Sequence, residues 1–329
     1  MSESRMIMTK TPLRITFVGG GTDIPSFYRE HGPGAVVSAA INKYIYIIVN
    51  KKFDKKIRVS YSTTEIVDAV DEIKHPTVRE ALRLLNIDGG IEIVSISDIP
   101  SEGTGLGSSS SFLVGLLNAL HAWKGELVSP KQLAEEAVKI EREILKEPGG
   151  KQDQYIAAYG GIQYMEFNKD ESVIVKPVIM PEEKRRALRE NLILFYTGKH
   201  RKSTDIHKNQ MKEAENKVES YSKMKELALT MYDSLAKGKI EETGKLLHEN
   251  WLLKKQLANG ISDDSIDMMY KSAMDLGATG GKLIGAGGGG FLLFYAEKGR
   301  HKSITEVLKL KLEPFDFEAL GSRIVHIGE

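Results

Sequence analysis

The chain has 329 residues, which is long enough for two domains that each bury a core of their own. Its 46 Lys and Arg residues nearly balance its 45 Asp and Glu residues, and the net charge of +1 argues against nucleic acid as a partner. The absence of cysteine excludes a disulfide framework, a thiol nucleophile and a thiolate zinc site.

The first half of the chain is expected to mix strands with helices. Segments rich in β-branched and aromatic residues with partial alternation predict strands at 12–18, 35–50, 56–61 and 90–97. Periodic apolar residues and serine or proline start signals predict helices at 75–86, 110–123 and 130–146. The last of these helices is expected to stop before Pro148.

A polar, charged segment after residue 165 indicates a hairpin and a connector, so we expect two domains, 1–185 and 186–329. The second domain is expected to contain strands at 192–196, 291–296 and 323–327. Between the first two strands, helices are expected at 203–236, 239–258 and 263–276. A short helix is expected before the last strand.

Three glycine-rich segments stand out, and the first is GGGTD at 19–23. It follows an apolar strand, and its glycines allow a ligand to approach the backbone closely. Asp23 could accept hydrogen bonds from sugar hydroxyls. The alternative is a tight strand exit in which Asp23 only caps the segment that follows.

The second segment, GTGLGSSSS at 103–111, leads directly into the helix predicted at 110–123. Backbone N–H groups of a glycine-rich turn at a helix N-terminus bind phosphate. No lysine follows the glycines, so this is not a Walker A loop, and the spacing does not fit a dinucleotide fingerprint. A flexible linker is the alternative.

The third segment, GATGGKLIGAGGGG at 277–290, interleaves glycines with apolar residues and runs into the strand FLLFYA. Such a segment is typical of a loop that closes over a ligand. A low-complexity linker is the alternative.

In this order, the three segments resemble the motifs of the GHMP kinase family over nearly the whole chain. The family motif P-x3-G-L-G-S-S-A corresponds to PSEGTGLGSSSS, although Ser110 replaces alanine and Gly105 lies one place later. The resemblance implies a two-domain α/β (α+β) fold. The N-terminal domain is expected to resemble ribosomal protein S5 domain 2, the C-terminal domain to be ferredoxin-like, and the active site to lie between them.

The resemblance also assigns a site for ATP and Mg²⁺. The ATP phosphates are expected to contact Gly103, Thr104, Gly105, Leu106, Gly107, Ser108, Ser109 and Ser110. Mg²⁺ is expected to be held by Ser109, with Ser108 as the second choice, together with Glu141 on the following helix. Glu141 borders the apolar face of that helix, but it could also be one of several solvated helix charges.

The catalytic residues implied by the resemblance are Asp153, facing the acceptor hydroxyl, and Arg14, near the transferred phosphate. A helix-capping role is the alternative for Asp153. The GGGTD form and the stretch EPGGKQDQ resemble the sugar-1-kinase branch of the family. Sugar contacts are therefore expected from Gly20, Gly21, Thr22, Asp23, Gly150, Lys151 and Gln152.

A basic turn, TGKHRKST at 197–204, favours a phosphorylated sugar. Lys199 and Arg201 lie beside an expected helix N-terminus, where cations and backbone N–H groups suit a phosphate dianion. The alternative is a solvated basic turn without a ligand.

The expected activity is therefore ATP- and Mg²⁺-dependent phosphorylation of the anomeric hydroxyl of D-glycero-D-manno-heptose 7-phosphate, for nucleotide-activated heptose and surface glycoconjugates. Alternatives are a kinase for L-fucose or another hexose, a non-catalytic binding protein of the same fold and, more distantly, a dinucleotide-dependent oxidoreductase. We expect a cytoplasmic protein without membrane contact, because the sequence has neither a secretion signal nor an apolar run of roughly 20 residues. A homodimer is left open.

Overall fold

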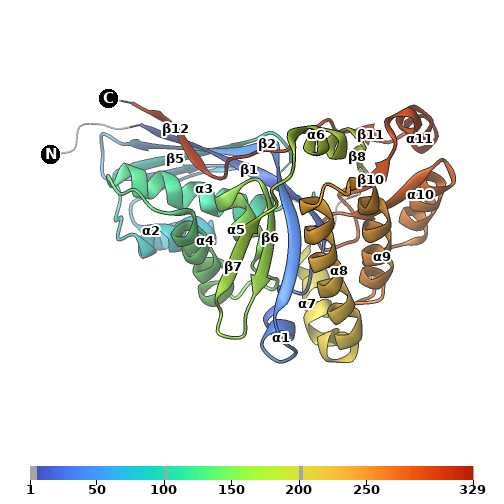
Figure 1. Cartoon of the computed structure of the whole chain (residues 1–329). Coiled ribbons are helices and arrows are strands. Elements are labelled where there is room, and N and C mark those ends of the chain that lie inside the picture. The colour runs from blue at the N-terminus through green and yellow to red at the C-terminus, as the bar shows by residue number, and fades with distance from the viewer. Residues whose placement is uncertain (1–5, 101–102, 200–202, 329) are drawn as a thin grey trace.

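The structure is a computed structural model of the chain and describes residues 6–100, 103–199 and 203–328. It contains two β-sheets, each with its own helices, and the long strand β2 runs through the middle of the molecule (Figure 1). Within the described ranges, every helix is too short or too polar to cross a membrane.

The first sheet has eight strands, and β2 pairs with different neighbours along its length. Its N-terminal part, from Gly34 to Ala39, pairs with β6, and its C-terminal part, from Ile45 to Lys51, pairs with β5. All pairs are antiparallel except β3 with β5. The strands are β1 (Ile7–Val18), β2 (Gly34–Lys51), β3 (Ile57–Ser60), β4 (Thr64–Val67), β5 (Ile91–Ser97), β6 (Ile162–Phe167), β7 (Val173–Pro177) and β12 (Arg323–Ile327).

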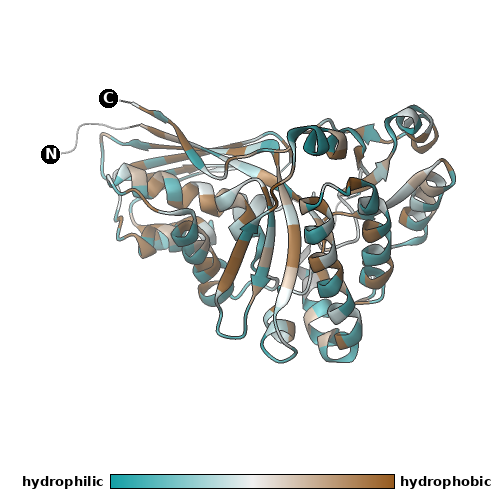
Figure 2. Ribbon diagram, viewed as in Figure 1, coloured by the Kyte–Doolittle hydropathy of each residue, from teal (hydrophilic) through white to brown (hydrophobic). Residues whose placement is uncertain are grey.

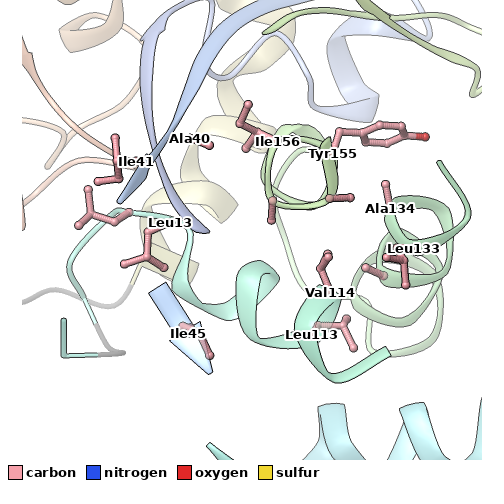
Figure 3. Close-up of a cluster of buried hydrophobic side chains, with 14 of the residues drawn as sticks. Leu13, Ala40, Ile41, Ile45, Leu113, Val114, Leu133, Ala134, Tyr155 and Ile156 are labelled. Atoms are coloured by element: carbon pink, nitrogen blue, oxygen red, sulfur yellow. The ribbon is translucent and has the colours of Figure 1, made fainter. Parts of the chain in front are cut away.

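The main core lies between the first sheet and the helices α3, α4 and α5. Leu13 and Ile45 of the sheet, Val114 of α3 and Ile156 of α5 belong to one cluster of buried side chains (Figure 3). Residues 11–18 of β1 are buried at every position, whereas residues 7–10 alternate. This pattern indicates that the C-terminal part of β1, which leads to the first glycine segment, is covered on both faces.

The second sheet has the strand order β11-β8-β10-β9 and is antiparallel throughout. Helices follow β8 and β10, so the chain runs β-α-β-β-α-β, as the ferredoxin-like expectation requires. The strands are β8 (Leu192–Tyr196), β9 (Ala278–Leu283), β10 (Phe291–Ala296) and β11 (Lys311–Leu312). The mixed α/β fold class is confirmed.

The helices cover the sheets with their apolar faces and leave their polar faces outward, as Figure 2 shows for α8 and α9. Their bounds are α1 (Pro25–Tyr28), α2 (Pro76–Leu84), α3 (Ser108–Trp123), α4 (Pro130–Val138), α5 (Gln152–Tyr159), α6 (Glu182–Glu190), α7 (Ser203–Glu213), α8 (Val218–Ala236), α9 (Thr243–Lys255), α10 (Asp264–Asp275) and α11 (His301–Leu308).

Two expected helices are interrupted. The helix predicted at 130–146 is α4 followed by a π-helical turn over Lys139–Ile144, and the helix predicted at 203–236 is divided into α7 and α8 by a 3₁₀ turn over Ala214–Lys217. Apolar periodicity does not distinguish an interrupted helix from a continuous one here, because the apolar stripe continues across each change of helix type. The π-helical turn is important for the site described below.

The last strand of the chain pairs with the first. β12 is antiparallel to β1, with Ile7 opposite Ile327, so the C-terminus returns to the sheet of the N-terminal half. The predicted division into 1–185 and 186–329 remains a proposal. The position of β12 shows that the first sheet contains strands from both parts of that division.

Candidate active site

The second glycine segment forms a loop that ends at the first turn of α3. In α3 the first backbone N–H groups have no partner within the helix, and the N-cap is Gly107, not a residue whose side chain caps them. Unpaired N–H groups at a helix N-terminus bind anions. The loop and the helix end therefore offer backbone N–H donors to an anion, and the predicted binding of phosphate there remains a proposal.

The third glycine segment packs directly against this loop. A Cβ atom on Gly105 would lie 2.4 Å from the carbonyl oxygen of Ile284, and a Cβ atom on Gly285 would lie 2.5 Å from the Cα atom of Gly105. Only glycine permits so close an approach of two backbones. The glycine-loop pocket between the two segments is lined by Gly103–Gly105, Gly107–Ser110, Glu141, Arg142, Glu147, Pro148, Ile284–Gly287, Gly289, Arg14 and Asp153.

Glu141 lies on the π-helical turn after α4 and points into the glycine-loop pocket, although it is only 1% exposed. Its carboxylate accepts hydrogen bonds from the hydroxyls of Ser109 at 3.0 Å and Ser110 at 2.8 Å, and from the amide of Gln154. The hydroxyl of Ser108 is buried without a partner among the described residues. The structure thus brings together Glu141 and Ser109, the two residues expected to hold the metal.

A second carboxylate, Glu147, lines the same pocket. Burial raises its pKa, and the negative charge of Glu141 raises it further, so a cation between the two would relieve an unfavourable arrangement. Within the described part of the chain, no group of three or more His, Asp or Glu residues could hold a metal by itself. The oxygen donors of Glu141 and Ser109 fit Mg²⁺ that is also bound to phosphate.

Asp153 and Arg14 form a bidentate ion pair beside the glycine loop. Asp153 lies in the first turn of α5, and its carboxylate oxygens accept from Nε of Arg14 at 2.7 Å and from Nη2 at 2.6 Å. Nη1 of Arg14 donates to the carbonyl oxygen of Gly105. Arg14 therefore connects the carboxylate to the anion-binding loop.

The first glycine segment forms a second pocket around Asp23, which is only 2% exposed. The Asp23 carboxylate accepts hydrogen bonds from the backbone N–H groups of Gly21 and Gln152, each at 3.0 Å. Burial raises the pKa of Asp23, and the charge of Asp153 acts in the same direction. A Cβ atom on Gly150 would lie 1.9 Å from the carboxylate, so glycine at this position lets Asp23 reach the N-terminus of α5.

The two pockets meet at Asp153. The Asp23 pocket is lined by Thr16, Gly20, Gly21, Asp23, Ile24, Gly150, Gln152, Gln210 and Lys254, and it shares Arg14, Arg142, Asp153, Gly285 and Ala286 with the glycine-loop pocket. The ion pair of Asp153 and Arg14 therefore belongs to both. Asp153 would therefore lie between a group bound in one pocket and a group bound in the other.

An aromatic pocket adjoins the glycine loop through Ser108 and Ser109. Its wall includes His75, whose ring stacks on Phe112 at 5.2 Å between centroids and meets the ring of Tyr61 edge-on at 4.8 Å. Burial lowers the pKa of His75, so the ring is neutral at pH 7. A flat, uncharged heteroaromatic ring would fit beside these side chains.

Besides Lys199, which is described below, three of the predicted site residues that the structure describes line neither pocket. Leu106 is fully buried in the core, and Thr22 exchanges hydrogen bonds of 2.9 Å with the backbone of Ala35. Lys151 forms an ion pair with Glu171, away from both pockets. Leu106 and Thr22 lie within the predicted segments, but their side chains are buried in the protein and do not face a pocket.

The predicted basic turn is only partly described. The ammonium group of Lys199 forms an ion pair with Asp263 at 2.7 Å and does not line the Asp23 pocket. Arg201 lies outside the described residues. The role of this turn in binding a phosphate remains a proposal. Of its two predicted phosphate-binding residues, Lys199 already pairs with Asp263.

The residues that line the pockets but were not predicted from the sequence include Arg142, Glu147, Gln210 and Lys254. Arg142 and Glu147 flank the predicted Glu141 and the helix stop, so their proximity to that motif could have indicated them. Gln210 and Lys254 come from α7 and α9 and belong to no motif. Burial and the charge of Arg14 lower the pKa of Lys254 to about 8.

Comparisons with known proteins agree with this arrangement. A model of the GHMP kinases N terminal domain matches residues 68–161, and one of the GHMP kinases C terminal domain matches 231–312. A Campylobacter jejuni protein named D-glycero-alpha-D-manno-heptose 7-phosphate kinase is 32% identical, over 96% of this chain and 98% of its own. A Pyrococcus furiosus galactokinase is 28% identical, over 95% and 96%.

Solved structures show the same likeness. The structure titled D-glycero-D-manno-heptose 1-phosphate kinase from Bacteriodes thetaiotaomicron superposes with a TM-score of 0.82 at 26% identity, over 98% of this chain and all of that one. A putative sugar kinase from Campylobacter jejuni superposes with a TM-score of 0.77 at 28% identity, over 97% and 98% of the two chains.

Proposed function

The chain belongs to the GHMP kinase family and is a sugar kinase, and we propose that it transfers the γ-phosphoryl group of ATP to the anomeric hydroxyl of D-glycero-D-manno-heptose 7-phosphate. The products would be the 1,7-bisphosphate and ADP. The observation that carries this proposal is the position of Asp153 at the junction of the two pockets.

On the acceptor side, the sugar would bind in the Asp23 pocket with its anomeric hydroxyl toward Asp153. The Asp153 carboxylate accepts a hydrogen bond from that hydroxyl, orients it and takes its proton as the new O–P bond forms. The bidentate pair with Arg14 fixes the direction of the carboxylate before the substrate arrives. Asp23 would bind a second hydroxyl of the sugar.

On the donor side, the ATP phosphates would bind to the glycine loop and the N-terminus of α3. The bond between the γ-phosphorus and the bridging oxygen breaks, and the electron pair remains on the β-phosphate of ADP. Arg14 offsets charge that develops on the transferred group, because it lies beside both the loop and Asp153. Ser109 and Glu141 would hold Mg²⁺, which neutralises phosphate charge when bound.

The adenine ring has a fitting place in the aromatic pocket. That pocket shares Ser108 and Ser109 with the glycine loop, so a nucleoside in it would be continuous with phosphates on the loop. The neutral ring of His75 and the ring of Phe112 offer stacking surfaces for a base.

The choice of acceptor is supported by the names of two relatives, both of which specify a heptose phosphate. These names differ in the position of the existing phosphate, which is C7 in one and C1 in the other. We propose the 7-phosphate as acceptor because the chain is 32% identical to the relative with that name over nearly its whole length.

One observation favours a second candidate, a kinase for an unphosphorylated sugar such as L-fucose or galactose. The pair of Lys199 with Asp263 leaves less positive charge in the turn expected to bind the far phosphate. A galactokinase and an L-fucokinase domain are also among the similar proteins.

Release of ADP with ATP and Mg²⁺ separates the two candidates. The acceptors would be heptose 7-phosphate, mannose 6-phosphate, L-fucose, galactose and mevalonate, each tested over a range of concentrations. Selective turnover of heptose 7-phosphate is expected. Turnover of an unphosphorylated sugar alone would replace the proposed acceptor by the second candidate, and no turnover of any acceptor would contradict both.

A further inference from the structure

Gln210 of α7 lies between two buried apolar residues, one in the preceding turn of the helix and one in the 3₁₀ turn that follows it. The residues one turn before and after it, Ile206 and Ala214, are 4% and 0% exposed, and both belong to the hydrophobic cluster that includes Ile24 and Phe27 of the first half. Gln210 is itself only 2% exposed. An aliphatic side chain at this position would pack against these apolar neighbours, so packing alone does not account for a buried amide here.

The amide of Gln210 lacks the partner that a buried amide requires. Its Nε2 atom is buried without a hydrogen-bond partner among the described residues, yet the side chain lines the Asp23 pocket. Natural proteins rarely leave such a group unpaired, because its lost hydration is not compensated unless a ligand or water supplies the partner. The pocket is therefore the place from which the missing partner would come.

The walls of the Asp23 pocket have complementary chemistry. The first half of the chain contributes the carboxylates of Asp23 and Asp153, whereas the second half contributes Gln210 and Lys254, whose side-chain nitrogens donate hydrogen bonds. A sugar hydroxyl can donate to a carboxylate and accept from an amide or ammonium. A polyhydroxylated acceptor between these walls could satisfy both.

We propose that Gln210 is a specificity-determining residue that hydrogen-bonds one ring hydroxyl of the acceptor sugar. This inference rests on the proposed function, because it assigns a contact within the same acceptor site. It adds that the second half of the chain takes part in selecting the sugar, together with Asp23 of the first half.

The test is steady-state kinetics of Gln210→Leu with the sugar that the wild-type chain phosphorylates best, followed by a panel of its monodeoxy analogues. We expect kcat/KM for the acceptor to fall about tenfold, the size of one lost hydrogen bond, while KM for ATP changes less than twofold. For the wild type, one deoxy analogue should be turned over much more slowly than the parent sugar. For Gln210→Leu that analogue and the parent should be turned over alike.

Gln163→Leu is the matched control for removal of a buried amide. Gln163 is 8% exposed on β6 and lines neither pocket, and its Nε2 donates to the carbonyl oxygen of Gly160 at 2.8 Å. This variant should lose thermal stability and keep both KM values. A merely structural role for Gln210 would make the two variants behave alike.

The outcomes separate this inference from the proposed acceptor. An unchanged kcat/KM in Gln210→Leu, or equal sensitivity of variant and wild type to every deoxy analogue, would overturn the role of Gln210 and leave the proposed acceptor intact. If the wild-type chain phosphorylates a different sugar, the proposed acceptor fails, and the same comparison with that sugar still decides the role of Gln210.

Discussion

The two halves of the molecule contribute to the active site in different ways. The first half supplies contiguous segments, in which the glycine loop, Glu141 and Asp153 are held by dense networks of hydrogen bonds. The second half contributes the third glycine segment, which packs against the glycine loop, and two single side chains from separate helices, Gln210 and Lys254. Under the proposed function, this difference means that the residues for transfer are preorganised, whereas the second half adds individual side-chain contacts to the sugar.

The largest expected effect comes from removing the charge at the junction of the pockets. Asp153→Asn should reduce kcat about 1,000-fold, because the hydroxyl loses the group that orients it and takes its proton. Initial rates at saturating ATP and sugar measure this loss. A kcat within tenfold of the wild type would show that Asp153 neither orients the acceptor hydroxyl nor takes its proton.

The next largest effect is expected at Glu141. Glu141→Gln should reduce kcat about 100-fold and raise the Mg²⁺ concentration needed for half-maximal rate, because an amide is a weaker ligand than a carboxylate. A Mg²⁺ titration at fixed ATP measures both. The control is Glu143→Gln, which changes an exposed residue of the same π-helical turn and should leave both values unaltered.

A smaller effect, with a distinct pH dependence, is expected at Lys254. Burial and the charge of Arg14 lower its pKa to about 8, and the charges of Asp23 and Asp153 act in the opposite direction. Buried Lys282 is a further basic group nearby, and burial together with the charges of Lys254 and Arg14 lowers its pKa well below the usual lysine value. Lys254 is therefore cationic below about pH 8 and becomes neutral above it.

If the charge of Lys254 binds acceptor oxygens, kcat/KM for the sugar should fall as the pH rises through about 8. Lys254→Met should lower kcat/KM about tenfold at pH 7 and lack this alkaline decline. A pH–rate profile of both proteins measures the difference. The same alkaline decline in the variant would assign that titration to another group.

The smallest effect is expected at Lys199 of the basic turn. Lys199 and Asp263 are about one-third exposed, at 34% and 38%, so their ion pair contributes about 0–1 kcal/mol to stability. Lys199→Ala should change KM for the acceptor less than twofold. A much larger rise would show that Lys199 leaves Asp263 to bind the substrate.

Arg201→Ala tests the same turn at its other predicted residue. If the turn binds the far phosphate of the sugar, this variant should raise KM for heptose 7-phosphate about tenfold and leave KM for ATP unaltered. An unchanged acceptor KM would end the proposal that the turn holds a phosphate.

The contrast between the halves also explains what the sequence could predict. The residue types of the glycine loop were sufficient to expect an anion site, and the resemblance of the motifs to the family added Glu141, Asp153 and Arg14 beside it. The structure places these residues around one pocket. Leu106 and Thr22 belong to the same motifs but support them from within the core.

The remaining features depend on contacts between distant segments, which no local pattern contains. Gln210 and Lys254 reach the pocket only because α7 and α9 pack beside the first glycine segment. Similarly, β12 reaches β1 across almost the full length of the chain. The π-helical turn preserves the apolar stripe of a regular helix, so periodicity did not reveal it.

The most direct test of the central claim is phosphorus NMR of the product formed from heptose 7-phosphate, ATP and Mg²⁺. The account predicts one new resonance whose phosphorus couples to the anomeric proton, because Asp153 would activate the anomeric hydroxyl. This resonance should be missing after the same incubation with Asp153→Asn. A new phosphate coupled to any other sugar proton, or its formation at an undiminished rate by Asp153→Asn, would contradict the account.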